Sequence, residues 1–246
     1  MTDTTVRLLP IEGTYNLREV GGYRAGHTTV RSGKLYRSDA LNGLTESGRH
    51  ALADLGIRRI VDLRTEEEVT AGPTRLDADV EIVHAPIFTA SHRPVELAGD
   101  DVTLSAVYDV MVDGHGRQLT DAVRLIASAG DGAVLVHCTA GKDRTGLVVA
   151  LALLAAGVDR EEVVADYAQT SANLSGEWAA RMLDTMRGAG GPVSPAMQEI
   201  VTASPASELT RVISRWDSEW GSPADYLRAH GITDEELTAL SAMLLV

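Results

Sequence analysis

The segment AVLVHCTAGKDRTGLVVALALLAAG, residues 133–157, constrains the fold of this chain more than any other feature. Its first five residues have the length and β-branched content of a buried strand, and its last eleven form an apolar run of helical length. Between them lies a short loop that contains a cysteine, a glycine and an arginine. A strand that passes through such a loop into an apolar helix is typical of α/β proteins.

Other strand-length segments support an α/β fold. Apolar runs at 59–63, 80–85 and 133–137 have strand character, and helical patterns lie between them. We therefore expect a central mixed sheet flanked by helices.

Capping residues mark the starts of several predicted helices. Thr45 precedes one helical pattern, Asp159 precedes a second, and Thr233 precedes the last. Glu162 and Glu236 follow the second and third of these caps by three residues, the spacing of a capping box.

The 246 residues contain no repeat and no long linker, so we expect one domain over residues 1–246. The stretch 175–221 is helical in pattern and is interrupted by GAGGPVSP. We interpret it as a helical lid inserted in the domain. It contains all three tryptophans, Trp178, Trp216 and Trp220, for which packing onto the core is the plainer expectation.

Charge and hydropathy limit the partners. A formal net charge of −13 argues against a sequence-independent grip on nucleic acid or on an anionic membrane. The apolar run that starts at Leu147 is shorter than the roughly 20 residues needed to span a bilayer, so no membrane insertion is expected. No secretory signal is visible at the N-terminus, which indicates a cytoplasmic protein. The single cysteine leaves no intramolecular disulfide to form.

The spacing of Cys138 and Arg144 indicates phosphate chemistry. Five residues separate them, enough for a loop to curl around a phosphate with the N–H groups of residues 139–144 pointing inward. Gly141 allows so tight a turn. The positive end of the following helix favours the thiolate form of Cys138, and the planar fork of Arg144 matches two phosphate oxygens.

These residues predict a phosphate monoester hydrolase that works through a phosphocysteine intermediate without a metal or another cofactor. Cys138 attacks phosphorus, and water then releases the phosphate. Thr145, directly after the arginine, is expected to hydrogen-bond the sulfur as it leaves. The expected phosphate-binding residues are Thr139, Ala140, Gly141, Lys142, Asp143 and Arg144.

The motif HCTAGKDRTG resembles the signature loop of protein tyrosine phosphatases. Its AGKDRTG form is similar to the atypical bacterial tyrosine/serine phosphatases, a family with a secreted mycobacterial member. The resemblance extends nearly end to end, through TYNLREV, LYRSDAL, VDLRTEEEV and SPADYLRAHGIT. It implies a tyrosine phosphatase-like fold with a mobile helical lid, activity on phosphotyrosine, phosphoserine/threonine and some phosphoinositides, and possible export without a signal peptide.

Two aspartates are candidates for the general acid, since no Trp-Pro-Asp loop is present. We favour Asp62, which ends a strand at the expected ligand edge of the sheet and matches the family's DLR segment. Asp143 is the other candidate, although an ion pair with its neighbours Lys142 and Arg144 is its plainer role. His137 is expected to buttress the loop.

Two alternatives stay open. Lys142 is similar to a lysine of phosphoinositide phosphatases of this fold and would add positive charge over the phosphate, so lipid substrates remain candidates beside phosphorylated proteins. A catalytically weak phosphoprotein-binding module is the second alternative.

Overall fold

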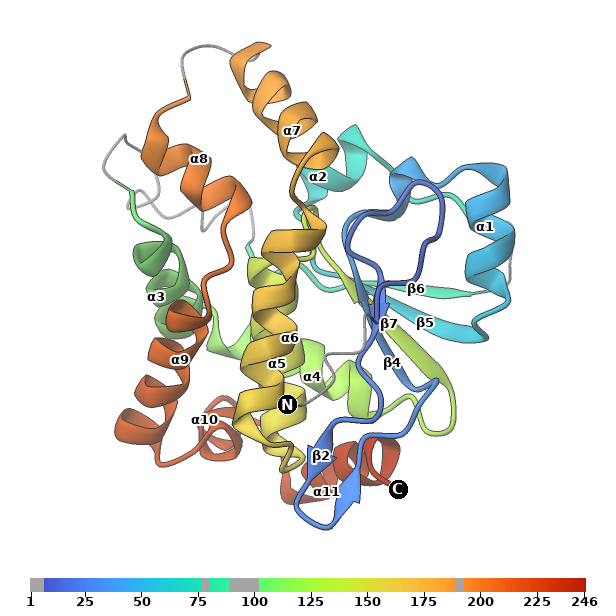
Figure 1. Cartoon of the computed structure of the whole chain (residues 1–246). Helices are drawn as coiled ribbons and strands as arrows, with labels where there is room; N and C mark the ends of the chain where they lie inside the picture. The colour runs from blue at the N-terminus through green and yellow to red at the C-terminus, as the bar shows by residue number, and fades with distance from the viewer. Residues whose placement is uncertain (1–6, 77–79, 89–101, 189–192) are drawn as a thin grey trace.

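A computed structural model describes residues 7–76, 80–88, 102–188 and 193–246. At its centre lies a five-stranded sheet with the strand order β1-β4-β7-β5-β6 (Figure 1). The strands are β1 (Arg18–Glu19), β4 (Leu35–Ser38), β7 (Ala133–His137), β5 (Ile57–Asp62) and β6 (Glu81–His84). The last four run parallel and β1 is antiparallel to β4, so the sheet is mixed, as predicted. Strands β2 (Arg24–Ala25) and β3 (Thr28–Thr29) form a separate hairpin.

The central strand β7 shows why these residues form a sheet buried on both faces. All five of its residues are buried. Val134 and Val136 belong to the larger hydrophobic core, whereas Ala133 and Leu135 belong to a smaller core on the other face. This alternation follows from the two-residue period of a strand.

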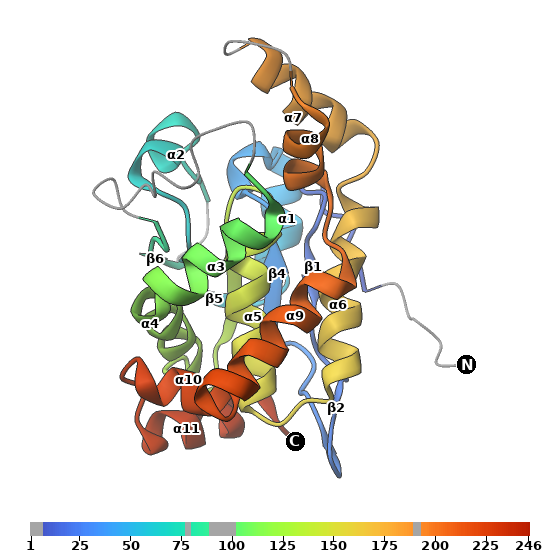
Figure 2. The same cartoon turned by 90° about the vertical axis from the view of Figure 1, so that its left-hand side faces the viewer.

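The two cores divide the helices into layers (Figures 1 and 2). The smaller core is covered by α1 (Glu46–Ala53) and the 3₁₀ turn η1 (Leu41–Gly43). The larger core is covered by α3 (Leu104–Gly114), α4 (Gly116–Ala127), α5 (Asp143–Ala155), α6 (Arg160–Asn173), α9 (Ala206–Arg215), the π-helix η4 (Trp216–Trp220), α10 (Pro223–Ala229) and α11 (Asp234–Leu244). Helix α2 (Glu66–Ala71) lies between β5 and β6 in the chain.

Helix α5 is the apolar helix predicted after the cysteine loop. Every residue from Thr145 to Leu153 is buried, which agrees with a sequence that is apolar on all sides. No helix in the described ranges is long and apolar enough to cross a membrane.

Two of the three predicted helix starts have the expected cap. The Thr45 side chain accepts a hydrogen bond from the Gly48 N–H, and Thr233 forms a complete capping box with Glu236. The box predicted at Asp159 is wrong, because Asp159 makes no side-chain cap. The carboxylate of Glu162 instead accepts hydrogen bonds from the backbone and side chain of Arg24.

The segment 175–221 divides into two parts. Helices α7 (Glu177–Gly188) and α8 (Pro195–Thr202) pack on each other and stand above the rest of the molecule (Figures 1 and 2). Helix α9 packs instead against α6 and α3, and Trp216 after it is fully buried against Tyr226. Residues 189–192 of the expected lid lie outside the described residues.

Candidate active site

The loop that follows β7 carries the predicted nucleophile at its first position. Cys138 comes directly after β7, and Lys142 is the N-cap residue of α5, so the loop lies between the carboxyl end of a central strand and the positive end of a buried helix. The Cys138 side chain belongs to the larger core and is 2% exposed. Cys138 thus lies between an edge of the sheet and a helix N-terminus, the two features that α/β proteins use to bind anions.

The carbonyl groups of residues 139–141 are all held from outside the loop. The hydrogen bonds run from Ala40 N to Thr139 O (3.0 Å), from Asn16 Nδ2 to Ala140 O (3.1 Å) and Gly141 O (3.1 Å), and from Arg37 Nη2 to Gly141 O (2.9 Å). In a planar trans peptide the C=O and the next N–H point in opposite directions. The N–H groups of residues 140–142 are therefore turned toward the inside of the loop, as an anion-binding loop requires.

Gly141 is the residue that this close packing requires. Its φ is +63°, and a Cβ at this position would lie 2.2 Å from Ser38 O. Any larger residue would push the loop away from the end of β4.

A buried ionic cluster supports these outside donors. The Asp166 carboxylate accepts hydrogen bonds from Arg18 Nε at 2.8 Å and from Arg37 Nη1 at 2.6 Å. Burial alone would raise the pKa of Asp166, but the two arginines lower it to about 2. This Asp166 cluster (Arg18, Arg37 and Asp166) fixes Arg37, which in turn holds the Gly141 carbonyl. The segments TYNLREV and LYRSDAL were recognised in the sequence by resemblance, but the part that Asn16 and Arg37 play was missed.

Arg144 lies at the other end of the loop and is paired with Glu68 of α2. Arg144 Nη1 donates to Glu68 Oε2 at 2.6 Å and Nη2 donates to Oε1 at 2.8 Å. Burial alone would lower the pKa of Arg144, but the hydrogen bonds to Glu68 and the nearby Cys138 raise it overall. A guanidinium carries five N–H donors, so the pair orients Arg144 while other donors remain for a phosphate.

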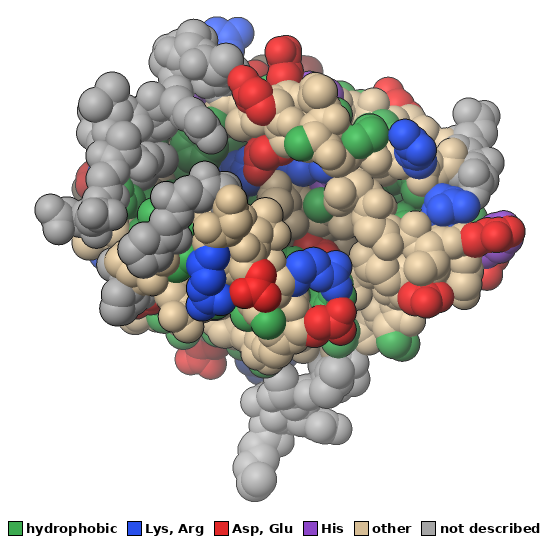
Figure 3. Space-filling view, turned by 90° about the horizontal axis from the view of Figure 1, so that it is seen from above, with side chains coloured by type: hydrophobic (Ala, Val, Ile, Leu, Met, Phe, Trp, Pro, Cys, Tyr) green, Lys and Arg blue, Asp and Glu red, His purple; other side chains and the backbone are tan. Residues whose placement is uncertain are grey.

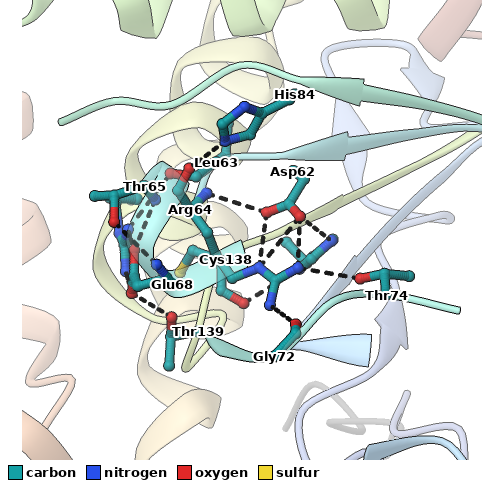
Figure 4. Close-up of polar contacts among 12 residues, drawn as sticks. Asp62, Leu63, Arg64, Thr65, Glu68, Gly72, Thr74, His84, Cys138 and Thr139 are labelled. Carbon is teal, nitrogen blue, oxygen red and sulfur yellow. Dashed lines mark hydrogen bonds and ion pairs between the residues drawn. The ribbon is translucent and has the colours of Figure 1, made fainter. Parts of the chain in front are cut away.

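Glu68 itself is fixed by its own helix and by the loop (Figure 4). It closes a capping box with Thr65, and its Oε1 accepts a hydrogen bond from the Thr139 hydroxyl. Burial raises its pKa, but the contacts with Arg144 and Thr139 outweigh burial and bring it to about 2. Glu68 was not among the predicted site residues, although the T-x-x-E spacing of a capping box was visible in the sequence.

Asp62, the favoured general acid, is locked in an ion pair (Figure 4). Arg64 donates to it from Nε at 2.9 Å, from Nη2 at 2.7 Å and from the backbone N–H at 3.1 Å. Asp62 is 3% exposed; burial raises its pKa, but the contacts with Arg64 lower it overall. Arg64 also donates to Gly72 O at 2.7 Å. This arrangement opposes the expected role, because an ionised carboxylate enclosed by a guanidinium has no proton to give. It fastens the connection from β5 to α2.

Asp143, the second candidate, lies in the first turn of α5 and is partly open to solvent. Its side chain is 23% exposed, and its Oδ1 lies 2.9 Å from Lys142 Nζ, the ion pair expected from the sequence. The same oxygen accepts a hydrogen bond of 2.9 Å from the Tyr108 hydroxyl.

Lys142 reaches toward α8. Its Nζ donates to Ile200 O at 2.7 Å and to Ala203 O at 2.8 Å, and the residue is 1% exposed. In this structure its ammonium therefore joins the signature loop to the end of α8.

Thr145 and His137 complete the surroundings of the cysteine. The Thr145 hydroxyl is buried and has no hydrogen-bond partner within the described residues, so the predicted bond to sulfur is not formed in this structure. His137 Nδ1 lies 3.2 Å from Cys138 O. Burial lowers its pKa to about 4, so the ring is neutral at pH 7 and suits the expected role of buttressing the loop.

The surface above the carboxyl ends of the strands is hollowed near its centre, with acidic and basic side chains in the walls (Figure 3). A strand, an inward-facing amide loop with cysteine first and arginine last, and a buried helix are the features of the protein tyrosine phosphatase class. Residues 9–246 match the sequence model of the tyrosine phosphatase family. The chain belongs to this family and is a hydrolase of the tyrosine phosphatase type.

Two relatives agree with this assignment. A tyrosine-protein phosphatase of Nostoc commune is 30% identical over 224 residues, covering 88% of this chain and 76% of the relative. The triple specificity protein phosphatase PtpB of Mycobacterium tuberculosis is 29% identical over 291 residues, covering 98% of this chain and 99% of the relative. Among solved structures, P. aeruginosa TpbA aligns with a TM-score of 0.37 at 18% identity, over 71% of this chain and 90% of TpbA.

Proposed function

We propose that this chain hydrolyses phosphotyrosine in proteins, with Cys138 as the nucleophile and Arg144 as the phosphate clamp. The observation that carries the proposal is the set of outside hydrogen bonds to the carbonyls of residues 139–141, which turns the loop amides inward. Inward amides, a helix N-terminus and an oriented guanidinium together stabilise the charge on the transferring phosphoryl group.

The proposed reaction has two displacements at phosphorus. The Cys138 thiolate forms the S–P bond as the P–O bond to the tyrosine breaks, and a general acid protonates the departing phenolate. Water then attacks phosphorus and gives its proton to the same carboxylate, while the S–P bond breaks and restores the thiolate. The two steps together return the protein to its starting charge and need no oxidant and no co-reactant other than water.

We assign the acid to Asp143 in place of Asp62. Both contacts of Asp143 described above involve Oδ1, so we assign the proton to Oδ2. Both carboxylate oxygens of Asp62 accept hydrogen bonds from Arg64, and the pKa of Asp62 is lowered, so Asp62 is a poor proton donor.

Phosphoserine and phosphothreonine are proposed as further substrates, on the strength of the similarity to the relative named a triple specificity phosphatase. For phosphoinositides the proposal depends on Lys142. Its ammonium is bound by carbonyls at the end of α8, so a lipid headgroup would have to draw Nζ away from them.

For the lid we propose α7 and α8 alone. These two helices pack on each other above the body, whereas α9 and the π-helix are part of the larger core. Lys142 then connects the lid to the loop that binds phosphate.

The first experiment compares Cys138→Ser and Arg144→Lys with the wild type, using 4-nitrophenyl phosphate in the presence of EDTA. We expect Cys138→Ser to retain vanadate binding and to lose more than about 99% of turnover, because the oxygen nucleophile is not ionised at neutral pH. Arg144→Lys should be nearly as inactive, since lysine cannot bind two oxygens in one plane. Vanadate binding by a wild type that shows no turnover would instead support the phosphoprotein-binding alternative.

The second experiment measures pH–rate profiles and a substrate panel. Asp143→Asn should remove the limb of the kcat profile that reports the acid, while Asp62→Asn should keep it. The opposite result would return the role to Asp62. Phosphotyrosine, phosphoserine and phosphoinositide substrates at one pH then rank the specificities.

A further inference from the structure

Two buried tyrosines lie behind Asp143. The Tyr108 hydroxyl, from α3, donates to Asp143 Oδ1 at 2.9 Å and lies 2.7 Å from the Tyr167 hydroxyl of α6. The two rings are edge to face, with centroids 6.3 Å apart, and are 0% and 1% exposed. Three segments distant in the chain therefore meet at the carboxylate that we assign as the acid.

The donors in this group have a fixed direction. Asp143 Oδ1 accepts whether the carboxyl is ionised or carries a proton on Oδ2, so the Tyr108 proton points to Asp143, and the Tyr108 oxygen is then the acceptor for the Tyr167 proton. Burial and the charge of Asp143 raise the pKa of Tyr108 well above its ordinary value, and the same two causes raise the pKa of Tyr167. Both hydroxyls therefore stay protonated through the pH range in which the protein works.

Gly146 makes room for this arrangement. A Cβ at Gly146 would lie 3.0 Å from Cδ2 of the Tyr167 ring. The glycine that follows Arg144 and Thr145 in the signature motif thus lets Tyr167 approach the first turn of α5, where Asp143 lies.

We propose that Tyr108, held by Tyr167, is a positioning residue that orients the Asp143 carboxyl toward the leaving oxygen of the substrate. The inference rests on the proposed role of Asp143 as general acid. Tyr108 and Lys142 both contact Oδ1, so a proton on Oδ2 comes and goes without breaking either contact. The orientation is the same in the step that donates the proton and in the step that takes it back.

The test compares Tyr108→Phe with Tyr226→Phe. Tyr226 is also fully buried, but its hydroxyl donates to Val112 O and does not contact the signature loop. Tyr108→Phe removes two hydrogen bonds of a buried hydroxyl and Tyr226→Phe removes one, so the thermal stability of both variants is measured as a check on folding. The readout is kcat/KM, which reports the step in which the leaving group departs, on phosphotyrosine peptide, whose leaving phenol has a high pKa, against kcat/KM on 4-nitrophenyl phosphate, whose leaving phenolate needs less protonation.

We expect Tyr108→Phe to lower kcat/KM on phosphotyrosine by about tenfold or more, with a much smaller loss of kcat/KM on 4-nitrophenyl phosphate and unchanged inhibition by vanadate. Tyr226→Phe should keep the wild-type ratio of the two rates. In an Asp143→Asn background, Tyr108→Phe should have no further effect on that ratio. Equal losses on both substrates, or an effect that persists without Asp143, would overturn the inference.

The same data separate two kinds of failure. If Asp143→Asn itself leaves the ratio unchanged, the acid assignment fails and the inference fails with it. If Asp143→Asn changes the ratio and Tyr108→Phe does not, only the positioning role is wrong. Should Tyr108→Phe fail to fold, Tyr167→Phe carries the test, with a smaller change expected in the same direction.

Discussion

Both terminal nitrogens of Arg144 donate hydrogen bonds to the Glu68 carboxylate, at 2.6 and 2.8 Å, although the two residues belong to helices in different parts of the chain. Glu68 lies in the first turn of α2, whereas Arg144 lies in the first turn of α5. The guanidinium is therefore held by a residue outside the signature motif, and its plane is set before a substrate arrives. In the proposed role of Arg144 as phosphate clamp, a guanidinium plane set in advance avoids reorganisation during the reaction.

The first prediction concerns acid stability. The pKa of Glu68 is lowered from 4.5 to about 2, so its contribution to folding is present above pH 4.5 and is lost as the pH falls toward 2. Glu68→Gln removes this contribution. Urea unfolding at pH 7 and pH 3.5 should show a smaller difference in stability for Glu68→Gln than for the wild type.

Glu66→Gln is the matched control, since Glu66 is an exposed acid in the first turn of the same helix. The stability of Glu66→Gln should depend on pH as that of the wild type does. If the two variants respond alike, the effect belongs to the charge of the helix N-terminus and not to the pair with Arg144.

The second prediction concerns the Asp166 cluster. Asp166→Asn leaves Arg18 and Arg37 buried without their counter-charge, which should lower the free energy of unfolding by about 3–5 kcal/mol. Asp184→Asn breaks an exposed ion pair with Arg187 and should change the free energy of unfolding by less than about 1 kcal/mol. Chemical unfolding at pH 7 measures both. A small effect for Asp166→Asn would mean that water or another group replaces the carboxylate.

The third prediction uses the two lysines of the chain, Lys34 and Lys142. Lys142 Nζ donates to two carbonyls of the α8 end and is 1% exposed, whereas Lys34 is only partly buried. Reductive methylation, followed by peptide mass spectrometry, should modify Lys142 at least about tenfold more slowly, because reaction requires local opening. Equal rates would show that the contact between Lys142 and α8 is transient.

The elements recognised from the sequence were those with a strong local pattern. Strand β7 and helix α5 follow from apolar runs of the right length, and Cys138 and Arg144 follow from their spacing. The family resemblance added the rest of the fold class. Strands β1 and β4 were not predicted as strands, since β1 has two residues and each strand carries an arginine, Arg18 or Arg37, whose burial only the tertiary contact with Asp166 explains.

Asp62 stands at the expected edge of the sheet, but the sequence did not show that the Arg64 side chain folds back onto its carboxylate. The contact of Tyr108 with Asp143 joins residues 35 positions apart, and no spacing rule connects them.

The last prediction tests where the lid ends. Trp178 lies in α7, whereas Trp216 is fully buried in the π-helix against Tyr226. If only α7 and α8 respond to an anion, the change in fluorescence caused by vanadate should come from Trp178. Trp178→Phe should therefore abolish the change, and Trp216→Phe should lower the total intensity while leaving the change in place. The reverse pattern would extend the moving part to α9 and the π-helix, which would require the larger core to open.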